Sequence, residues 1–325
     1  MKKGFTFKNR HSGEFGILMK TRSRRLIPEA KSCFYTAPLM DGSYDFSAAN
    51  NAGREFYNDR VFELDIQMTA SRLDELERKC ARAASWLTGS GELVFDSMPL
   101  AVWTGRFVSE LSFTPERHGK KAVISAVFQA RPIGRASFTT GGGIRLGDGV
   151  PLDSDIPLDM SAYFEKRLAH GENEIDFVNL GDFYVRPVLR FCFGDTNICA
   201  AAYDNELPPG ERTSSVCGRA LTRSVTSSEQ TVTGAKNITI TYGDSKIMLE
   251  GIAADAVVDL EKCVVTDGTG NSLMNKMQGR FFELPPGRST LSVYVSAPCT
   301  LVIDYAPQTI YDFDFSSIDW GDAYA

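Results

Sequence analysis

The stretch VFELDIQM at residues 61–68 decides the fold of the first half of the chain. Its apolar residues alternate strictly with Glu63, Asp65 and Gln67, which is the period of two expected of a strand that buries one face. Because the alternation holds over the whole stretch, it predicts a half-buried strand at the edge of a hydrophobic core.

A single amphipathic helix is predicted directly after this strand, in SRLDELERKCARAASWLTG at residues 71–89. Residues 71–74 carry the side-chain acceptors of a capping box, and Gly89 supplies a C-terminal stop. Between them the apolar residues recur at helical spacing, at Leu73, Leu76, Cys80, Ala83 and Leu87. Strand patterns then return around residues 93–95, 101–107, 108–113 and 122–130. Residues 1–136 are therefore predicted to form an N-terminal β-sandwich or α+β domain with one helix.

The second half of the chain has a different pattern. Residues 137–175 are rich in Gly, Pro and Asp, which predicts a linker or insertion, with a short helix at residues 160–169. Residues 176–311 contain many short strand patterns separated by turns, among them residues 183–193 and 257–265, which is typical of a β-sandwich or jelly roll. Residues 312–325 form an acidic, aromatic tail that either ends a final strand or docks on a neighbour. The predicted fold class is mainly β with one helix in the first domain.

Composition excludes several classes of protein. The chain has 43% hydrophobic and 23% charged residues, which are ordinary globular values, and no apolar run approaches the roughly 18 residues of a membrane helix. Its seven cysteines are an odd number without C-x-x-C spacing, so we expect reduced, mostly packed thiols and neither a disulfide framework nor a zinc knuckle. A net charge of −6 gives no general attraction to nucleic acid.

No motif indicates catalysis, a cofactor or a metal. The glycine-rich run at residues 141–147 lacks the Lys-Ser/Thr of a phosphate loop, and the three histidines have no metal-ligand spacing. Residues 312–323 begin like a calcium loop but lack its glycine and its last acidic ligand. A pair of carboxylates for glycoside hydrolysis has a spatial signature, so a wall-degrading enzyme remains an alternative.

Charge is distributed unevenly along the chain. Residues 1–31 carry nine basic and two acidic side chains, a net charge of +7, whereas residues 289–325 carry five Asp and no basic residue, a net charge of −5. One interpretation is that the two regions help subunits to meet head to tail. The alternative is two solvated faces without a dedicated partner.

Several short motifs follow one another in a recognisable order. In the first half they are FTF at residues 5–7, SGEFGI at 12–17, Pro28, APLMDGSYD at 37–45 with its DG turn, and YNDR at 57–60. In the second half they are NLGD at 179–182, RP at 186–187, NITI at 237–240, VDL at 258–260, GRFFELPPG at 279–287 and IDY at 303–305. Together these motifs resemble the distal tail proteins of long-tailed, non-contractile bacteriophages. The chain departs from that pattern at residues 140–175, at residues 287–289 and beyond residue 310.

The resemblance implies a non-enzymatic structural subunit of the virion tail tip, made in the cytoplasm of the bacterial host. Its N-terminal domain would form a homohexameric ring, a baseplate element between the tail tube protein and the tail-tip hub or tail-associated protein. The C-terminal domain would be a galectin-like β-sandwich that projects outward and in some members carries receptor-binding proteins, although a fold does not bring sugar binding with it. No cofactor, metal, membrane or specific nucleic acid is implied.

Three arginines are the residue-level hypothesis that follows. We assign Arg22, Arg24 and Arg25 to an inter-subunit or lumen-facing role, with a solvated surface as the alternative. A competing function is a carbohydrate- or receptor-binding module of a phage or cell-surface complex, in which exposed aromatic rings of the second domain stack on sugars.

Overall fold

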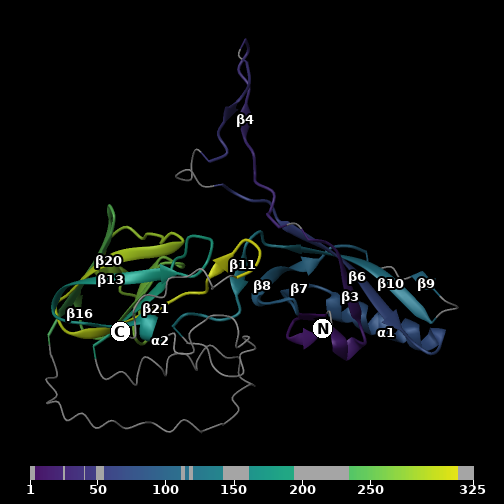
Figure 1. The fold of residues 1–325 in the computed structure, drawn as a ribbon. Coiled ribbons are helices and arrows are strands. Elements are labelled where there is room, and N and C mark those ends of the chain that lie inside the picture. The colour runs from purple at the N-terminus through teal and green to yellow at the C-terminus, as the bar shows by residue number, and fades with distance from the viewer. Residues whose placement is uncertain are drawn as a thin grey trace, which may run out of the picture.

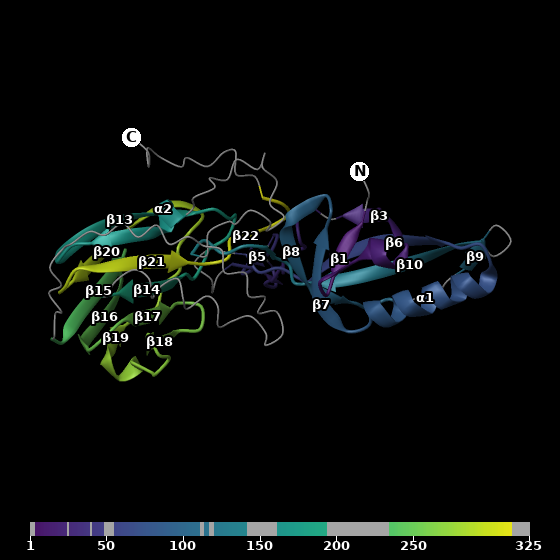
Figure 2. The same ribbon diagram turned by 90° about the horizontal axis from the view of Figure 1, so that it is seen from below.

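The computed structural model describes residues 4–24, 26–39, 41–48, 55–110, 114–116, 120–141, 161–193 and 234–313, without the side chains of residues 20–24, 114–116 and 161–162. These residues form two bodies of β-sheet, and a slender arm rises from the N-terminal one (Figure 1). The view from below shows the same two bodies and the long helix of the N-terminal body (Figure 2). Residues 142–160 of the predicted linker and residues 314–325 of the predicted tail lie outside the described residues.

The N-terminal body is built on one antiparallel sheet of ten strands. Its main path runs β2-β1-β7-β8-β10-β6-β3, which are Arg10–His11, Phe5–Phe7, Ser90–Phe95, Met98–Phe107, Lys121–Ala130, Arg60–Thr69 and Leu18–Arg24. Beside this path, β9 (Thr114–Glu116) pairs with β10, β11 (Gly134–Ala136) pairs with β8, and β22 (Gln308–Thr309) pairs with β11. The sheet therefore contains a strand from the far end of the chain.

Strand β6 confirms the prediction made from VFELDIQM. Phe62, Leu64, Ile66 and Met68 are all at most 1% exposed, and the residues between them are not buried. The strand pairs over its full length with β10, which places Ile66 opposite Ile124. The alternating pattern thus corresponds to the face that the N-terminal core covers.

Helix α1 (Leu73–Leu87) follows β6 as predicted, but it begins without the predicted capping box. Its N-cap is Arg72, whose side chain makes no capping bond, and Oε2 of Glu75 instead accepts from the Ser71 N–H at 3.2 Å. Gly89 follows the helix with φ +87°, the left-handed conformation that the C-terminal stop requires. The predicted end of the helix is therefore confirmed, and its predicted cap is corrected.

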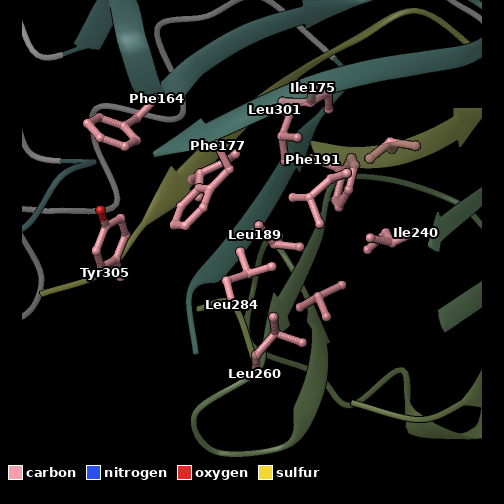
Figure 3. Close-up of a cluster of buried hydrophobic side chains, with 14 of the residues drawn as sticks. Phe164, Ile175, Phe177, Leu189, Phe191, Ile240, Leu260, Leu284, Leu301 and Tyr305 are labelled. Carbon is pink, nitrogen blue, oxygen red and sulfur yellow. The ribbon is translucent and has the colours of Figure 1, made fainter. Parts of the chain in front are cut away.

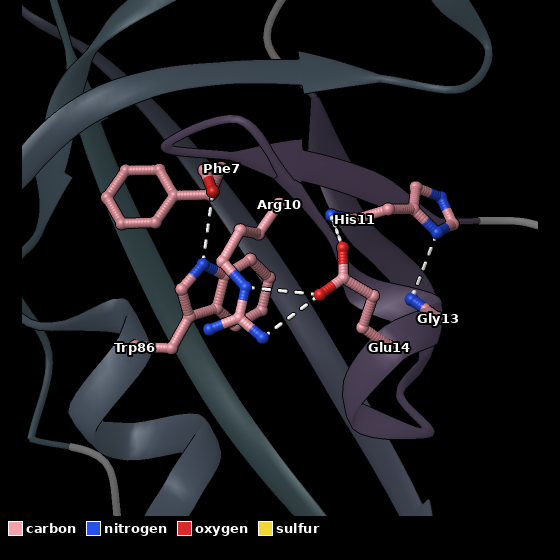
Figure 4. Close-up of polar contacts among 6 residues, drawn as sticks. All are labelled: Phe7, Arg10, His11, Gly13, Glu14 and Trp86. Carbon is pink, nitrogen blue, oxygen red and sulfur yellow. Dashed lines mark hydrogen bonds and ion pairs between the residues drawn. The ribbon is translucent and has the colours of Figure 1, made fainter. Parts of the chain in front are cut away.

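Trp86 attaches α1 to β1 and to the 3-10 turn η1 (Ser12–Phe15), where its ring stacks on that of Phe15 with the centroids 4.3 Å apart (Figure 4). Its indole N–H donates to the carbonyl of Phe7 at 3.0 Å. His11 caps the turn, because its Nδ1 accepts a backbone N–H of η1 at 3.0 Å while Oε1 of Glu14 accepts the His11 N–H at 3.3 Å. In this turn His11 is a structural side chain.

The second body contains two five-stranded antiparallel sheets. After the short helix α2 (Ser161–Phe164), one sheet has the order β12-β21-β14-β17-β18, which are Glu165–Leu168, Cys299–Asp304, Val188–Cys192, Ala256–Asp259 and Val264–Asp267. The other has the order β13-β20-β15-β16-β19, which are Gly171–Asn179, Gly287–Val295, Lys236–Tyr242, Ser245–Ile252 and Met277–Gly279, with the 3-10 turn η3 at Met274–Lys276.

One hydrophobic core fills the space between these two sheets (Figure 3). Phe177 and Phe191 come from opposite sheets and are at most 1% exposed. Tyr305 closes one end of the core: its hydroxyl donates to the carbonyl of Val178 at 2.8 Å and accepts the Leu180 N–H at 3.0 Å. Burial raises the pKa of this phenol well above its usual range. The mainly-β class with one long helix is confirmed.

The cysteines follow the prediction only in part. Cys33, Cys80, Cys263 and Cys299 are free thiols. The prediction is wrong for Cys192, which is disulfide-bonded. Spacing along the chain does not report which thiols meet in space, and a disulfide depends on that spatial proximity. None of the described helices combines the length and apolar character needed to cross a bilayer.

Candidate assembly surfaces

An arm leaves the N-terminal sheet between β3 and β6 and ends in a hairpin (Figure 1). Its two strands are β4 (Phe34–Tyr35) and β5 (Tyr44–Asp45), which pair antiparallel. The Phe46 N–H donates to the carbonyl of Cys33 at 2.8 Å and extends this pairing by one residue pair. Gly42, in the predicted DG turn, has φ +83°, a conformation that favours glycine.

The register divides the hairpin into two unlike faces. Residues opposite each other in an antiparallel pair share a face, and neighbours along a strand alternate. One face, here called the aromatic face, is formed by Cys33, Tyr35, Tyr44 and Phe46. The opposite face is formed by Phe34, Thr36, Ser43 and Asp45.

The aromatic face has large apolar rings without cover among the described residues. Tyr35, Tyr44 and Phe46 are 59%, 55% and 49% exposed. Further exposed apolar side chains follow along the arm, at Leu26, Ile27, Leu39 and Phe56. An isolated two-stranded hairpin is marginally stable in water, and concentrated exposed apolar surface marks an interaction site. The arm is therefore the strongest candidate for an assembly surface.

The base of the arm is held by a buried arginine. Ala30 and Tyr57 form an antiparallel bridge between its two limbs. Arg60, 1% exposed, donates from Nη2 to the carbonyl of Leu26 at 3.2 Å, and its guanidinium lies 4.7 Å from the ring centroid of Trp103. Burial lowers the pKa of Arg60 to about 10, and its Nε and Nη1 have no partner among the described residues. The cation is accommodated chiefly by aromatic faces.

An apolar groove lies between α1 and strands β6 and β10. Its volume is about 190 Å³. Ile66 and Ile124 form its floor on the sheet. The helix lines the groove with Cys80, Ala81, Ala84 and Leu87, and Glu77 lies at its edge. Burial raises the pKa of the Cys80 thiol. Ile66, Cys80, Leu87 and Ile124 are at most 5% exposed, so the groove is a narrow gap in the packing of the N-terminal core.

Strand β3 is the last strand of the N-terminal sheet on the side of the arm. Arg22 and Arg24 belong to this strand, and the register with β6 shifts between Thr21 and Ser23, which places Arg22 at the irregularity. Their side chains and the whole of Arg25 lie outside what the structure describes. Unpaired main-chain groups of an outer strand can pair with another chain. The assignment of the three arginines stays a prediction.

The NLGD motif at residues 179–182 joins the two bodies. The Asp182 carboxylate accepts from the hydroxyl of Thr309 at 2.9 Å and from the Ile310 N–H at 3.1 Å, and the Asp182 N–H donates to the carbonyl of Gln308 at 2.8 Å. These residues belong to or follow β22, whose Thr309 lies opposite Gly134 of β11 in the N-terminal sheet. The motif therefore holds the segment at Gln308, Thr309 and Ile310, where the chain passes from the second body back to the N-terminal sheet. We call these hydrogen bonds to Asp182 the clasp.

The outer face of the second body is less distinctive. Tyr294 on β20 is 36% exposed, lies opposite Glu172, and its ring centroid is 6.5 Å from that of His170. This ring is where a carbohydrate-binding function would be placed. Its exposed apolar area is smaller than that of the arm.

Two observations in the described residues bear on metal binding and on a titratable side chain. No group of three His, Cys, Asp or Glu side chains is placed there to hold a metal ion. The Asp267 carboxylate is occupied by its own turn, in which hydrogen bonds from Asn271 and Thr269 lower its pKa to about 2. His170 lies beside Tyr294, and His118 is outside the described residues.

Sequence reasoning missed the aromatic face and the groove. A signal for the former was present, because Phe34-Tyr35 precedes the DG turn and Tyr44-Asp45-Phe46 follows it. The groove had no comparable signal. Its residues belong to the predicted core patterns of α1, β6 and β10, and periodicity does not report a face that is only partly covered.

Comparison with known proteins bears on the fold. The chain matches no protein-family model and no curated protein. Among solved structures it matches the Dit (gp 19.1) protein of phage SPP1, described as a paradigm of the hub adsorption apparatus in phages that infect Gram-positive bacteria. The TM-score is 0.58 at 12% identity, over 94% of this chain and 98% of that chain. A weaker match, to the activated baseplate of phage P2, has a TM-score of 0.35 at 7% identity, over 93% of this chain and 98% of that chain. The likeness to a distal tail protein is thus confirmed as a likeness of fold.

Proposed function

We propose that this chain is a structural subunit of a phage tail tip that assembles head to tail into a closed ring. The observation that carries the proposal is the arm, whose aromatic face is large, apolar and uncovered among the described residues. A surface of this kind on one side of a subunit needs a different surface on the next, and such heterologous contacts close into rings. The fold shared with the SPP1 Dit protein supports a place in a tail tip.

We also propose the number of subunits in the ring and the positions of the two bodies within it. The N-terminal bodies of six chains surround a central channel between the tail tube and the tail-tip hub. The second body, a galectin-like β-sandwich, projects outward and can carry receptor-binding proteins. The clasp at Asp182 supports this arrangement, because it ties the projecting body to the sheet that builds the ring.

The solution mass of the purified protein tests ring formation. Across a concentration series, light scattering is expected to give a species of about 215 kDa, six times the 35.8 kDa of one chain. As a matched variant, residues 31–56 are replaced by a short Gly/Ser linker. The ends to be joined, Ala30 and Tyr57, already face each other in an antiparallel bridge, so a short linker can connect them. This variant is expected to be monomeric. A monomeric parent chain at every concentration, or a ring without the arm, contradicts the proposal.

The three arginines are tested separately by replacing Arg22, Arg24 and Arg25 with serine. If they contact a neighbour, ring assembly weakens, and assembly of the parent chain weakens with added salt, because exposed charges are screened over about 10 Å at 0.1 M ionic strength. The triple variant is expected to lose part of that salt dependence. Unchanged assembly with an unchanged response to salt returns these side chains to the solvated surface.

A further inference from the structure

We propose that Phe183 of the second body positions the arm for assembly, by packing against Tyr57 at the base of the arm. The two rings meet edge to face, with their centroids 6.0 Å apart and an interplanar angle of 74°. The inference rests on the proposed function, which assigns assembly to the arm, and it adds a contribution from the second body. Phe183 is a positioning residue, since it acts on a neighbouring subunit only through Tyr57.

Tyr57 belongs to the pairing from which the arm projects. Its backbone forms the antiparallel bridge to Ala30, and a main-chain hydrogen bond lies on each side of that bridge. The Lys31 N–H and the Asn58 N–H each donate to a carbonyl of the opposite limb at 2.7 Å. These bonds hold the two limbs together. A ring that packs on Tyr57 therefore stabilises the base on which the whole hairpin stands.

The loop that carries Phe183 is fixed to the second body. The side-chain amide of Asn179, 3% exposed, donates to the carbonyl of Phe183 at 2.6 Å and to that of Pro285 at 3.1 Å. Its Oδ1 accepts the Gly181 N–H at 3.0 Å. A buried polar side chain with its hydrogen bonds satisfied makes the surrounding structure rigid. The sandwich therefore sets the position of Phe183, and Phe183 in turn acts on the arm.

The base of the arm is thus held from both bodies. From the N-terminal body, Nη2 of Arg60 donates to the carbonyl of Leu26 at 3.2 Å. From the second body, Phe183 covers part of Tyr57, which is half-buried. In both views the arm starts beside the junction of the two bodies (Figures 1 and 2). The aromatic face lies at the far end of the arm, so a small change of angle at the base displaces it by a larger distance.

The coupling operates in both directions. Packing of Phe183 on Tyr57 favours the direction of the arm that a neighbouring subunit binds. An arm held by that neighbour then favours the same packing, because the coupling free energy between two sites is reciprocal. Removing one edge-to-face aromatic pair is expected to weaken each subunit contact about 2- to 10-fold. Light scattering would then show ring formation only at a higher protein concentration.

Amide hydrogen exchange on the full chain tests the positioning without requiring a ring. In protein diluted until light scattering shows a monomer, Phe183→Ala is expected to speed exchange at Lys31 and Asn58 about 2- to 10-fold. The amides of β15 and β20 are expected to keep their protection, which distinguishes this effect from unfolding of the second body. Phe183→Tyr retains the ring and is expected to restore the parent rates. Tyr184→Ala is the matched control, because it removes the adjacent, 40% exposed ring and keeps Phe183.

A double-mutant cycle assigns the effect to the pair of rings. Adding Phe183→Ala to Tyr57→Ala is expected to change exchange and assembly little, because the first substitution has already removed the contact. Additive effects, or unchanged exchange at Lys31 and Asn58 in Phe183→Ala, overturn the inference. Faster exchange with unchanged ring assembly also overturns it, because the arm then assembles without Phe183. A parent chain that forms no ring contradicts the proposed function instead, and the exchange rates still decide whether Phe183 holds the base of the arm.

Discussion

Replacing Trp103 with alanine is expected to lower the free energy of unfolding of the N-terminal body by about 4 kcal/mol, the largest stability loss that we predict. Trp103 has no exposed surface, and its ring centroid lies 5.2 Å from that of Phe62. It also lies beneath the guanidinium of Arg60 at 4.7 Å. Its removal therefore opens a cavity and takes away an aromatic face from a buried cation. Urea unfolding followed by far-ultraviolet circular dichroism measures the change.

The matched variant is Trp103→Phe, which retains an aromatic face for Arg60. It also removes an indole N–H that has no partner among the described residues, so part of the loss is recovered. We expect a loss of about 1–2 kcal/mol, set mainly by the smaller ring. Equal losses in the phenylalanine and alanine variants would contradict a role for the aromatic face in stabilising Arg60.

The consequence extends to the arm. Nη2 of Arg60 holds the carbonyl of Leu26 at 3.2 Å, and Arg60 begins β6. A guanidinium that loses its aromatic support is free to turn toward water, because an unpaired buried charge is unfavourable. The base of the arm then loses the hydrogen bond between Arg60 and Leu26 that holds it in place. For a protein that assembles through this arm, the alanine variant is expected to assemble less well even at temperatures where it remains folded.

The elements that the sequence predicted well are those whose periodicity is strong over a long stretch. Strand β6 and helix α1 both carry an uninterrupted apolar pattern, and both lie where that pattern places them. Individual side chains still departed from it: Leu73 was predicted to be buried and is 45% exposed, whereas Trp86 was not predicted and is 8% exposed. Trp86 is buried because a tertiary contact exists, and the carbonyl of Phe7 that it binds is 79 positions away.

Two predicted strands of the second body were wrong in extent for local reasons. Residues 257–265 looked like one strand, but they belong to β17 and β18, and the turn between them contains Cys263 at φ +55°. Residues 183–193 also looked like one strand, yet β14 starts only at Val188. The preceding segment contains an isolated bridge from Val185 to Leu284 instead. β-branched residues indicate extended backbone. Whether an extended segment joins a sheet depends on whether another strand lies next to it with free hydrogen-bonding groups.

The candidate site was less predictable than the fold. A sequence pattern identifies an apolar face, but it does not say whether that face is covered by the same chain. On the hairpin the aromatic face has no cover among the described residues, whereas β13 and β20, of similar alternating pattern, face a filled core. The hairpin is uncovered because the segment between residues 24 and 60 extends away from the N-terminal sheet. The periodicity of a local stretch of sequence does not predict this path.

Gly181→Ala is expected to detach the segment at Gln308, Thr309 and Ile310 from Asp182. A Cβ at this position would lie 2.2 Å from the carbonyl oxygen of Gln308 and 2.6 Å from its nitrogen, distances that the backbone of β22 can relieve only by moving away. Movement breaks the three hydrogen bonds between Asp182 and the chain at Gln308, Thr309 and Ile310. Overpacking and the lost hydrogen bonds together lower the free energy of unfolding by about 3 kcal/mol.

Hydrogen exchange distinguishes local detachment from general unfolding. The amides of Asp182 and Ile310 are expected to exchange much faster in Gly181→Ala, while those of β15 and β20 in the sandwich core keep their protection. Gly234→Ala is the matched control, because a Cβ there meets no atom of the described residues within 4 Å and little change is expected. If the clasp amides of Gly181→Ala exchange as slowly as in the parent chain, β22 has accommodated the methyl group and the clasp does not depend on glycine. If they exchange quickly and ring assembly persists, the clasp orients the second body without contributing to the ring, because the arm belongs to the N-terminal body.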